Sequence, residues 1–208
     1  TEKPLENYFS DLSYVNYVSD PDEWFVMLKA PSAWRILVPV DENLDDDLIR
    51  SDDYVRNIFK RALNSDDRIE TIHRTIYRVH QRVVDTMRSG RVILAGDSAH
   101  LNNPLGGFGM NGGLHDAWNL AKQLDEIINH NKNEELLDLY DRQRRTVMNE
   151  FIQKQTIRNK KMIEETGDDK YSSEWNRMRN IHQNDTERRQ YMFRQTMAQS
   201  LVREAEIS

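Results

Sequence analysis

Short apolar runs separated by turn residues occupy the first forty positions and predict strands. Between Leu5 and about Val40, aromatic and β-branched residues cluster in runs that break at Asp20-Pro21-Asp22 and at Ala30-Pro31-Ser32. Runs of this length bounded by Pro, Asp and Ser are typical of strands joined by tight turns. The pattern therefore predicts an antiparallel meander at the start of the chain.

The next part of the chain mixes a helix with further strands. The stretch 41–47 is acidic and turn-like, and the Ser-Asp-Asp that opens 51–63 is a suitable start for a helix. Apolar and polar residues then alternate over 69–84, which predicts one or two more strands. Gly90 ends a turn, and the apolar run 91–95 is expected to form a buried strand.

Helical periodicity begins after residue 107. Five apolar residues recur at spacings of three and four, a stripe suited to packing on a sheet: Leu114, Ala117, Ala121, Leu124 and Ile128. A second helix is predicted from about 133 to 165, ended by Gly167-Asp168-Asp169, with an inner side formed by Leu137, Tyr140, Val147, Phe151 and Ile152. The tail 172–206 is also helical in propensity, but its apolar residues are few: Trp175, Met178, Met192, Met197 and Leu201. We expect this tail to need a partner surface, either a missing half of the fold or another subunit.

A glycine-rich stretch directly after the predicted strand 91–95 carries the strongest chemical signal. It contains Gly96-Asp97-Ser98-Ala99-His100, and then Pro104-Leu105-Gly106-Gly107-Phe108-Gly109-Met110-Asn111. Glycines permit positive φ and close approach of backbone to a flat ligand. The first turn of the following helix offers unpaired N–H groups and a positive dipole end. This combination favours a flavin, a flat group that becomes anionic when it is reduced.

These residues, followed by Asp116-Ala117-Trp118-Asn119-Leu120, resemble the second flavin signature of the FAD-dependent aromatic hydroxylases. These are the class A flavoprotein monooxygenases, which include para-hydroxybenzoate hydroxylase. The stretches 24–28 and 34–40 look more loosely like strands of the family's substrate-covering sheet. Members begin with a strand and a Gly-x-Gly-x-x-Gly turn that holds the FAD pyrophosphate, and no such element precedes residue 91. The chain therefore resembles the C-terminal portion of a hydroxylase.

The resemblance implies a mixed α+β and α/β fold with three parts. Antiparallel strands in 1–85 would belong to the substrate-binding sheet domain. Residues 86–165, with one flavin-domain strand, its Gly-rich loop and long helices, would form the C-terminal part of the FAD-binding domain. Residues 166–208 would form a C-terminal helical segment.

The resemblance also implies the site residues. The expected FAD contacts are Gly96, Asp97, Pro104, Leu105, Gly106, Gly107, Gly109, Met110 and Asn111. Asp97 would accept a hydrogen bond from a ribitol hydroxyl, Pro104 would pack beside the isoalloxazine, and the N–H groups of Met110 and Asn111 would stabilise reduced flavin. Trp34, Arg35 and Phe108 are candidates for the substrate side. No catalytic acid or base and no metal site is assigned.

The implied activity is hydroxylation of an aromatic substrate. In that family NADH or NADPH reduces FAD, dioxygen adds to form a flavin hydroperoxide, and one oxygen is transferred to the ring. The rival interpretation is a flavin-fold remnant that has lost catalysis and serves as an interaction or regulatory subunit. A partner chain carrying the Gly-x-Gly-x-x-Gly half would distinguish a split enzyme from a remnant, and a homo-oligomer is a further expected assembly.

Three other interpretations of the motifs are weaker. Gly107-Phe108-Gly109-Met110-Asn111-Gly112 matches a dinucleotide fingerprint, but eleven residues separate it from the preceding strand and helix follows it. Gly96-Asp97-Ser98 opens the motif of the Gly-Asp-Ser esterases, yet no separate Asp-x-x-His pair exists to activate the serine. Six scattered histidines lack the spacing that a zinc site needs.

Composition adds few constraints. The 208 residues carry a net charge of −6, which argues against nucleic acid as a partner. The basic residues of 142–161 alternate with apolar positions and are interpreted as a solvated helix face. No apolar run reaches the roughly twenty residues of a membrane helix and no secretory leader is present, so cytoplasmic residence is expected. The chain has no cysteine, which excludes disulfides and thiolate chemistry.

Overall fold

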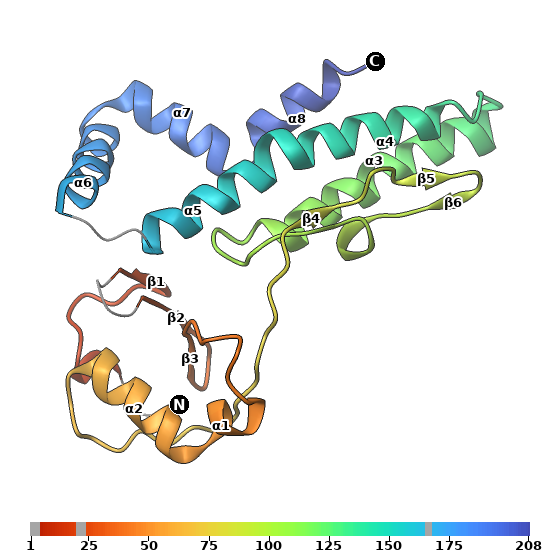
Figure 1. Ribbon diagram of the computed structural model, residues 1–208. Coiled ribbons are helices and arrows are strands. Elements are labelled where there is room, and N and C mark those ends of the chain that lie inside the picture. Colours follow the sequence, from red (N-terminus) through yellow and green to blue (C-terminus); the bar gives the residue numbers. More distant parts are fainter. Residues whose placement is uncertain (1–4, 20–23, 165–167) are drawn as a thin grey trace. The chain divides into compact units, whose positions relative to one another are not determined.

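The computed structural model describes residues 5–19, 24–164 and 168–208, which are drawn in colour in Figure 1. Contacts divide the chain into two compact units. The first contains Thr1–Arg78 and Ile163–Tyr171, and the second contains Val79–Met162 and Ser172–Ser208. The predicted boundaries near residues 85 and 165, and the roles given to those parts, stay predictions.

A three-stranded antiparallel sheet opens the first unit and confirms the predicted meander. Its strands, in the spatial order β1-β2-β3, are β1 (Val15–Val18), β2 (Phe25–Lys29) and β3 (Trp34–Leu37). Val15 lies opposite Leu28, and Lys29 lies opposite Trp34. β2 is buried at Phe25, Val26 and Met27, as expected for a central strand. The core of this unit forms where β2 and Trp34 meet Leu5, Phe59, Leu63 and Ile69.

Two helices follow the sheet, and both begin at side-chain caps. Ser51 accepts a hydrogen bond from the Tyr54 N–H and starts α2 (Asp52–Leu63), which confirms the predicted helix. α1 (Asp46–Arg50) forms where only an acidic turn was expected. The Asp45 carboxylate explains this helix, because it accepts hydrogen bonds from the backbone N–H groups of the first turn.

The strands predicted over 69–84 are largely wrong. Within this stretch the structure has only β4 (Arg82–Val83). Ile72 and Val79 are exposed, so the alternation does not mark a buried sheet face. Side-chain contacts hold the segment instead: the Arg74 guanidinium donates to the Arg50 carbonyl and pairs with Asp52 at 2.8 Å.

Short strands frame the glycine-rich stretch in the second unit. β4 pairs with β7 (His100–Leu101), β5 (Arg88–Ser89) pairs with β6 (Val92–Ile93), and η2 (Gly96–Ser98) is a single 3-10 turn. The buried strand expected over 91–95 is corrected, because β6 has two residues and Val92 is 66% exposed. Among the residues described, β5 is the one strand that pairs with β6, so half of its hydrogen-bonding edge remains open.

Long helices run beside these strands (Figure 1). α3 (Phe108–His130) packs against α4 (Leu136–Val147), which continues through a π-helical segment (Met148–Gln153) into α5 (Lys154–Glu164). This confirms the second predicted helix, whose expected end at 165 lies outside the described residues. Its inner side is also confirmed, with Phe151 half-buried and four residues buried: Leu137, Tyr140, Val147 and Ile152.

The packing face of α3 differs from the predicted one. The stripe expected to pack on a sheet lies largely outside, with Leu114 59% and Ile128 69% exposed. The buried positions are instead mostly polar or small: Phe108, Gly112, Asp116, Asn119 and Gln123. This polar face of α3 packs against α4 because its polar side chains form hydrogen bonds with side chains of α4.

The tail forms α6 (Asp168–Gln183), α7 (Asp185–Gln195) and α8 (Ala198–Ala205), which confirms its helical character. α8 packs against α4, and Met197 before it is buried in the same core as Phe108 and Tyr140. This end of the tail therefore has its partner surface within the chain, contrary to the expectation of an external one. The Trp175 side chain lies outside the part of the chain that the structure describes. Within the described ranges, no helix has both the length and the apolar character needed to cross a membrane.

Candidate functional site

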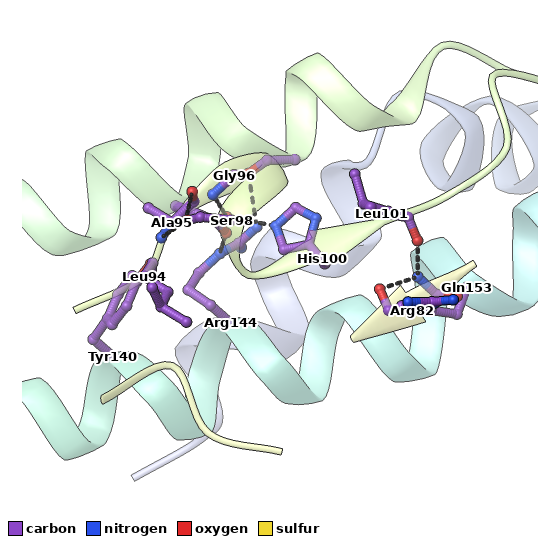
Figure 2. A network of polar contacts seen from close by, with 12 residues as sticks. Arg82, Leu94, Ala95, Gly96, Ser98, His100, Leu101, Tyr140, Arg144 and Gln153 are labelled. Atoms are coloured by element: carbon purple, nitrogen blue, oxygen red, sulfur yellow. Dashed lines mark hydrogen bonds and ion pairs between the residues drawn. The ribbon is translucent and has the colours of Figure 1, made fainter. Parts of the chain in front are cut away.

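The turn at Gly96 is fixed by two side chains other than Asp97. Gly96 has φ +60°, and its N–H donates to the Asp116 carboxylate at 2.9 Å. The Ser98 hydroxyl donates to the Ala95 carbonyl at 2.8 Å and accepts from the Ala95 N–H at 3.2 Å. These contacts stabilise η2, which begins shortly after the end of β6 (Figure 2).

Asp97 takes no part in the hydrogen bonds that fix this turn. Its side chain is exposed and makes no hydrogen bond within the described part of the chain. A carboxylate after a strand commonly caps the following loop, but here Ser98 and Asp116 do so. Asp97 is therefore available to accept a hydrogen bond from a ligand.

The loop that carries Pro104 is anchored by amide side chains. The Asn103 side chain donates to Gln81 Oε1 and to the Thr156 carbonyl, both at 3.0 Å, and accepts from the Leu105 N–H at 3.2 Å. Asn159 donates to the Leu105 carbonyl at 3.0 Å. Leu105 is thus buried, and its backbone N–H and carbonyl are both hydrogen-bonded. Pro104, next to it, is exposed, and these hydrogen bonds fix the loop on either side of it.

The start of α3 is open to an electron-rich group. Gly106 and Gly107 have φ of +102° and +70°, and Gly107 is the N-cap without a side-chain bond to the helix. No acidic residue lies in the first turn. Met110 is 76% exposed, and the exposed Asn111 amide donates back to the Gly107 carbonyl at 2.8 Å. An uncapped start of a 23-residue helix presents N–H donors and a positive dipole end to whatever lies against it.

A buried network of hydrogen bonds and ion pairs around Asp116 lies beneath the surface of this loop. Asp116 is fully buried, and one oxygen contacts His100 Nε2 at 2.6 Å while the other accepts from Arg144 Nε at 2.6 Å. Arg144 is also fully buried, and its Nη2 reaches the Gly112 carbonyl at 3.3 Å. Figure 2 shows His100 and Arg144 beside the turn at Gly96.

Opposing effects act on the Asp116 carboxyl. Burial by itself raises its pKa, but the hydrogen bond from His100 and the charge of Arg144 bring the pKa below its ordinary value. Asp116 is therefore ionised, and because a carboxylate can only accept, His100 Nε2 carries the shared hydrogen. Nearby, the Tyr140 hydroxyl donates to the Leu94 carbonyl at 2.8 Å, and burial raises the pKa of this phenol.

Asp116→Asn is expected to lower the free energy of unfolding by about 2 kcal/mol near pH 7, because charged hydrogen bonds are replaced by neutral ones. The folded pKa of Asp116 lies below 3.8, so its contribution is present above that pH and is lost as the pH falls through the folded value. Urea unfolding from about pH 7 to about pH 2 should show the gap between variant and wild type narrowing. A gap that stays constant would contradict the ionised network.

Comparison with known proteins identifies the family. Residues 2–155 match the family described as FAD binding domain. The chain belongs to this family.

Relatives of this FAD binding domain protein are monooxygenases by name. It is 40% identical over 125 residues to 6-hydroxy-3-succinoylpyridine 3-monooxygenase from Pseudomonas putida, covering 60% of the chain and 31% of that protein. It is 38% identical over 155 residues to para-nitrophenol 4-monooxygenase from a Pseudomonas strain, covering 70% of the chain and 38% of that protein. The crystal structure of p-nitrophenol 4-monooxygenase from Pseudomonas putida matches with a TM-score of 0.78 and 31% identity, over 88% of this chain and 48% of that one. The chain thus spans less than half the length of these relatives.

Some residues of the FAD binding domain protein escaped the sequence analysis. The interpretation of the basic residues of 142–161 as a solvated face is wrong for Arg144, which has no exposed surface. Its position between Tyr140 and Val147, at spacings of four and three on the buried side, could have indicated this. The roles of Asn103 and Glu204 had no local signal, because their partners are distant in the sequence.

The three substrate-side candidates have different surroundings. Trp34 is 6% exposed in the core of the first unit, with the Lys29 ammonium 5.3 Å from its ring centre. Arg35, beside it on β3, is exposed. Phe108 is 3% exposed in the core of the second unit, among Met148 and Ile152. Their contact with substrate stays a prediction, and of the three only Arg35 presents its side chain to solvent.

Proposed function

We propose that this chain forms part of an FAD-dependent monooxygenase that hydroxylates an aromatic ring, using NADH or NADPH as electron donor and dioxygen as oxidant. The observation that carries the proposal is an unpaired Asp97 carboxylate on a turn fixed by other residues, in the same loop region that leads to the uncapped start of α3. Membership of the FAD binding domain family supports the cofactor. The relatives' names, which specify a nitrophenol and a hydroxypyridine derivative, support an aromatic substrate.

The residues present in this loop fit FAD. Gly107 leaves open space where a side chain would be, so backbone can lie against a flat ring. The N–H groups at the start of α3 suit the edge of the flavin that gains negative charge on reduction. Asp97 would accept a hydrogen bond from a ribitol hydroxyl, and Pro104 would border the ring. When bound, FAD supplies the electron transfer and the oxygen chemistry, and these residues hold and polarise it.

We infer that the exposed apolar face of α3 packs against further flavin-domain structure that carries the Gly-x-Gly-x-x-Gly turn. The large apolar side chains on this face are each more than half exposed: Met110, Leu114, Trp118 and Ile128. An exposed apolar patch of this kind is typical of a surface that packs against other protein. The chain covers 48% of the matching monooxygenase structure, so such structure would come from additional residues of this protein or from a partner chain. Flavin binding is therefore best tested with and without that half.

Asp97→Ala is expected to weaken FAD binding roughly tenfold or more, the loss of one charge-assisted hydrogen bond. Fluorescence quenching of FAD titrated with the protein, with the complementary half added where the chain alone binds none, measures this directly. Asp85→Ala is the matched control, because Asp85 is an exposed aspartate of the same unit with no hydrogen bond in the described structure. Equal affinity in wild type and Asp97→Ala would overturn the assigned contact.

The same titration separates the proposal from its rival. Flavin bands retained after gel filtration, followed by NAD(P)H oxidation that depends on a phenol, would support the hydroxylase. Failure to bind FAD both alone and with the complementary half would support the flavin-fold remnant instead.

A further inference from the structure

The C-terminal helix reaches the candidate flavin loop through two buried side chains. Glu204 of α8 pairs with Arg144 Nη1, and its other oxygen accepts from Asn119 Nδ2 at 2.6 Å. The Glu204 side chain is only 15% exposed, which is low for a glutamate. Further contacts fix α8 on α4, since Gln143 donates to the Ile207 carbonyl at 3.0 Å.

From Glu204 the contacts continue to the turn that carries Asp97. Arg144 joins Glu204 to Asp116, and Asp116 accepts from the Gly96 N–H at 2.9 Å. Residues 204, 144, 116 and 96 are far apart in the sequence, so this path exists only in the folded chain. It ends one residue before the carboxylate proposed to hold the ribitol.

The charges in this path depend on one another. Arg144 lies between two carboxylates, and Asp116 and Arg144 have no exposed surface. A buried ion that loses its partner is strongly destabilised, so neighbouring groups move to restore contacts or admit water. Withdrawing Glu204 leaves Arg144 Nη1 without its carboxylate partner, so the guanidinium is expected to turn further onto Asp116 and to displace that carboxylate from its present contacts.

A shift of Asp116 would be transmitted to the loop by close packing. The α carbon of Gly96 is 3.3 Å from the position that a Cβ on Gly113 of α3 would occupy, so η2 and α3 touch through their backbones. A Cβ added to Gly112, in the same turn, would lie 3.0 Å from Met148 Cε and 3.4 Å from His100 Cε1. A contact this tight leaves the turn little room to adjust without displacing Asp97.

We propose that Glu204 and Arg144 are positioning residues of the flavin site, through which α8 sets the conformation of the Gly96-Asp97 turn. This inference rests on the proposed function, because it assigns the turn to FAD. We assign neither side chain a contact with the cofactor itself. Docking of α8 on α4 is thereby a condition for tight FAD binding.

Glu204→Gln tests this by removing the charge while keeping the size of the side chain. Hydrogen exchange of peptides covering residues 94–101 should be roughly tenfold faster than in wild type, a coupling of ordinary size between distant sites. FAD affinity should fall by a similar factor in the fluorescence titration. Glu206→Gln is the matched control, because Glu206 is exposed near the end of α8 and contacts Arg203. It should change neither measurement.

Glu204→Asp provides the conservative comparison and guards against loss of the fold. It keeps the charge, so exchange in 94–101 and FAD affinity should return most of the way to wild type, while exchange in α4 serves as the check on folding in every variant. Unchanged exchange at 94–101 in Glu204→Gln, or equal acceleration throughout α4 in both variants, would overturn the inference. Faster exchange confined to the turn in a protein that never binds FAD would support the coupling and refute the proposed function.

Discussion

Replacing Arg144 by methionine is expected to lower the free energy of unfolding by about 3–5 kcal/mol, the range for breaking a buried ion pair. Methionine fills much of the volume but supplies no charge to Asp116 or Glu204. Asp116 has no exposed surface, so water cannot readily take the place of the guanidinium. Urea unfolding followed by circular dichroism measures the loss, with the slope of the transition as a check on two-state behaviour.

The neighbouring arginine is the control for this experiment. Arg145 lies one position further along α4 and pairs with Asp141 at 3.1 Å, but its side chain is 36% exposed. Arg145→Met should therefore lower the free energy of unfolding by less than about 1 kcal/mol, because exposed ion pairs contribute no more than that to stability. Similar losses for the two variants would show that Arg144 contributes through general packing. In the double variant Arg144→Met with Asp116→Asn, the two losses should not add, because they break the same contact.

The difference between these two arginines illustrates what the sequence could predict. Features that depend on nearby residues were predicted well: Ser51 as a helix start, the meander broken at its turns, and the glycine-rich turn before α3. In each case the determining groups lie within a few positions of one another. The family resemblance, confirmed by the match over 2–155, has the same origin in one continuous motif.

Predictions that needed a distant partner failed. The apolar stripe of α3 has correct helical spacing, yet the buried face is the one whose Asp116 and Asn119 find Arg144, Gln143 and Glu204. A polar face becomes the packing face only when such partners exist, and periodicity cannot reveal them. The run 91–95 likewise has the composition of a buried strand, but a strand in the interior of a sheet needs neighbouring strands on both edges, and β6 has one among the described residues.

Gly106→Ala is expected to lower the free energy of unfolding by about 2–4 kcal/mol, from a strained backbone and a crowded side chain together. Gly106 has φ +102°, and a Cβ there would lie 2.4 Å from the Phe108 ring and 2.7 Å from the Asn159 amide. Phe108 is fixed in the core and Asn159 donates to the Leu105 carbonyl. Neither side chain can move away without weakening the contacts that fix the loop around Pro104. FAD binding should therefore fail as well.

A variant of the adjacent glycine distinguishes the effect of strain in the loop from the effect of contact with the cofactor. Gly107 also has positive φ, but a Cβ there would meet nothing within 4 Å. Gly107→Ala should cost only about 1 kcal/mol, the backbone term alone. If the loop lies against the flavin as proposed, that methyl group would occupy space needed by the ring, so FAD affinity should fall roughly tenfold or more despite near-normal stability. Thermal unfolding and FAD titration of the two variants side by side would reveal this split. Gly107→Ala with unchanged FAD affinity would mean that the flavin does not approach the loop at this residue.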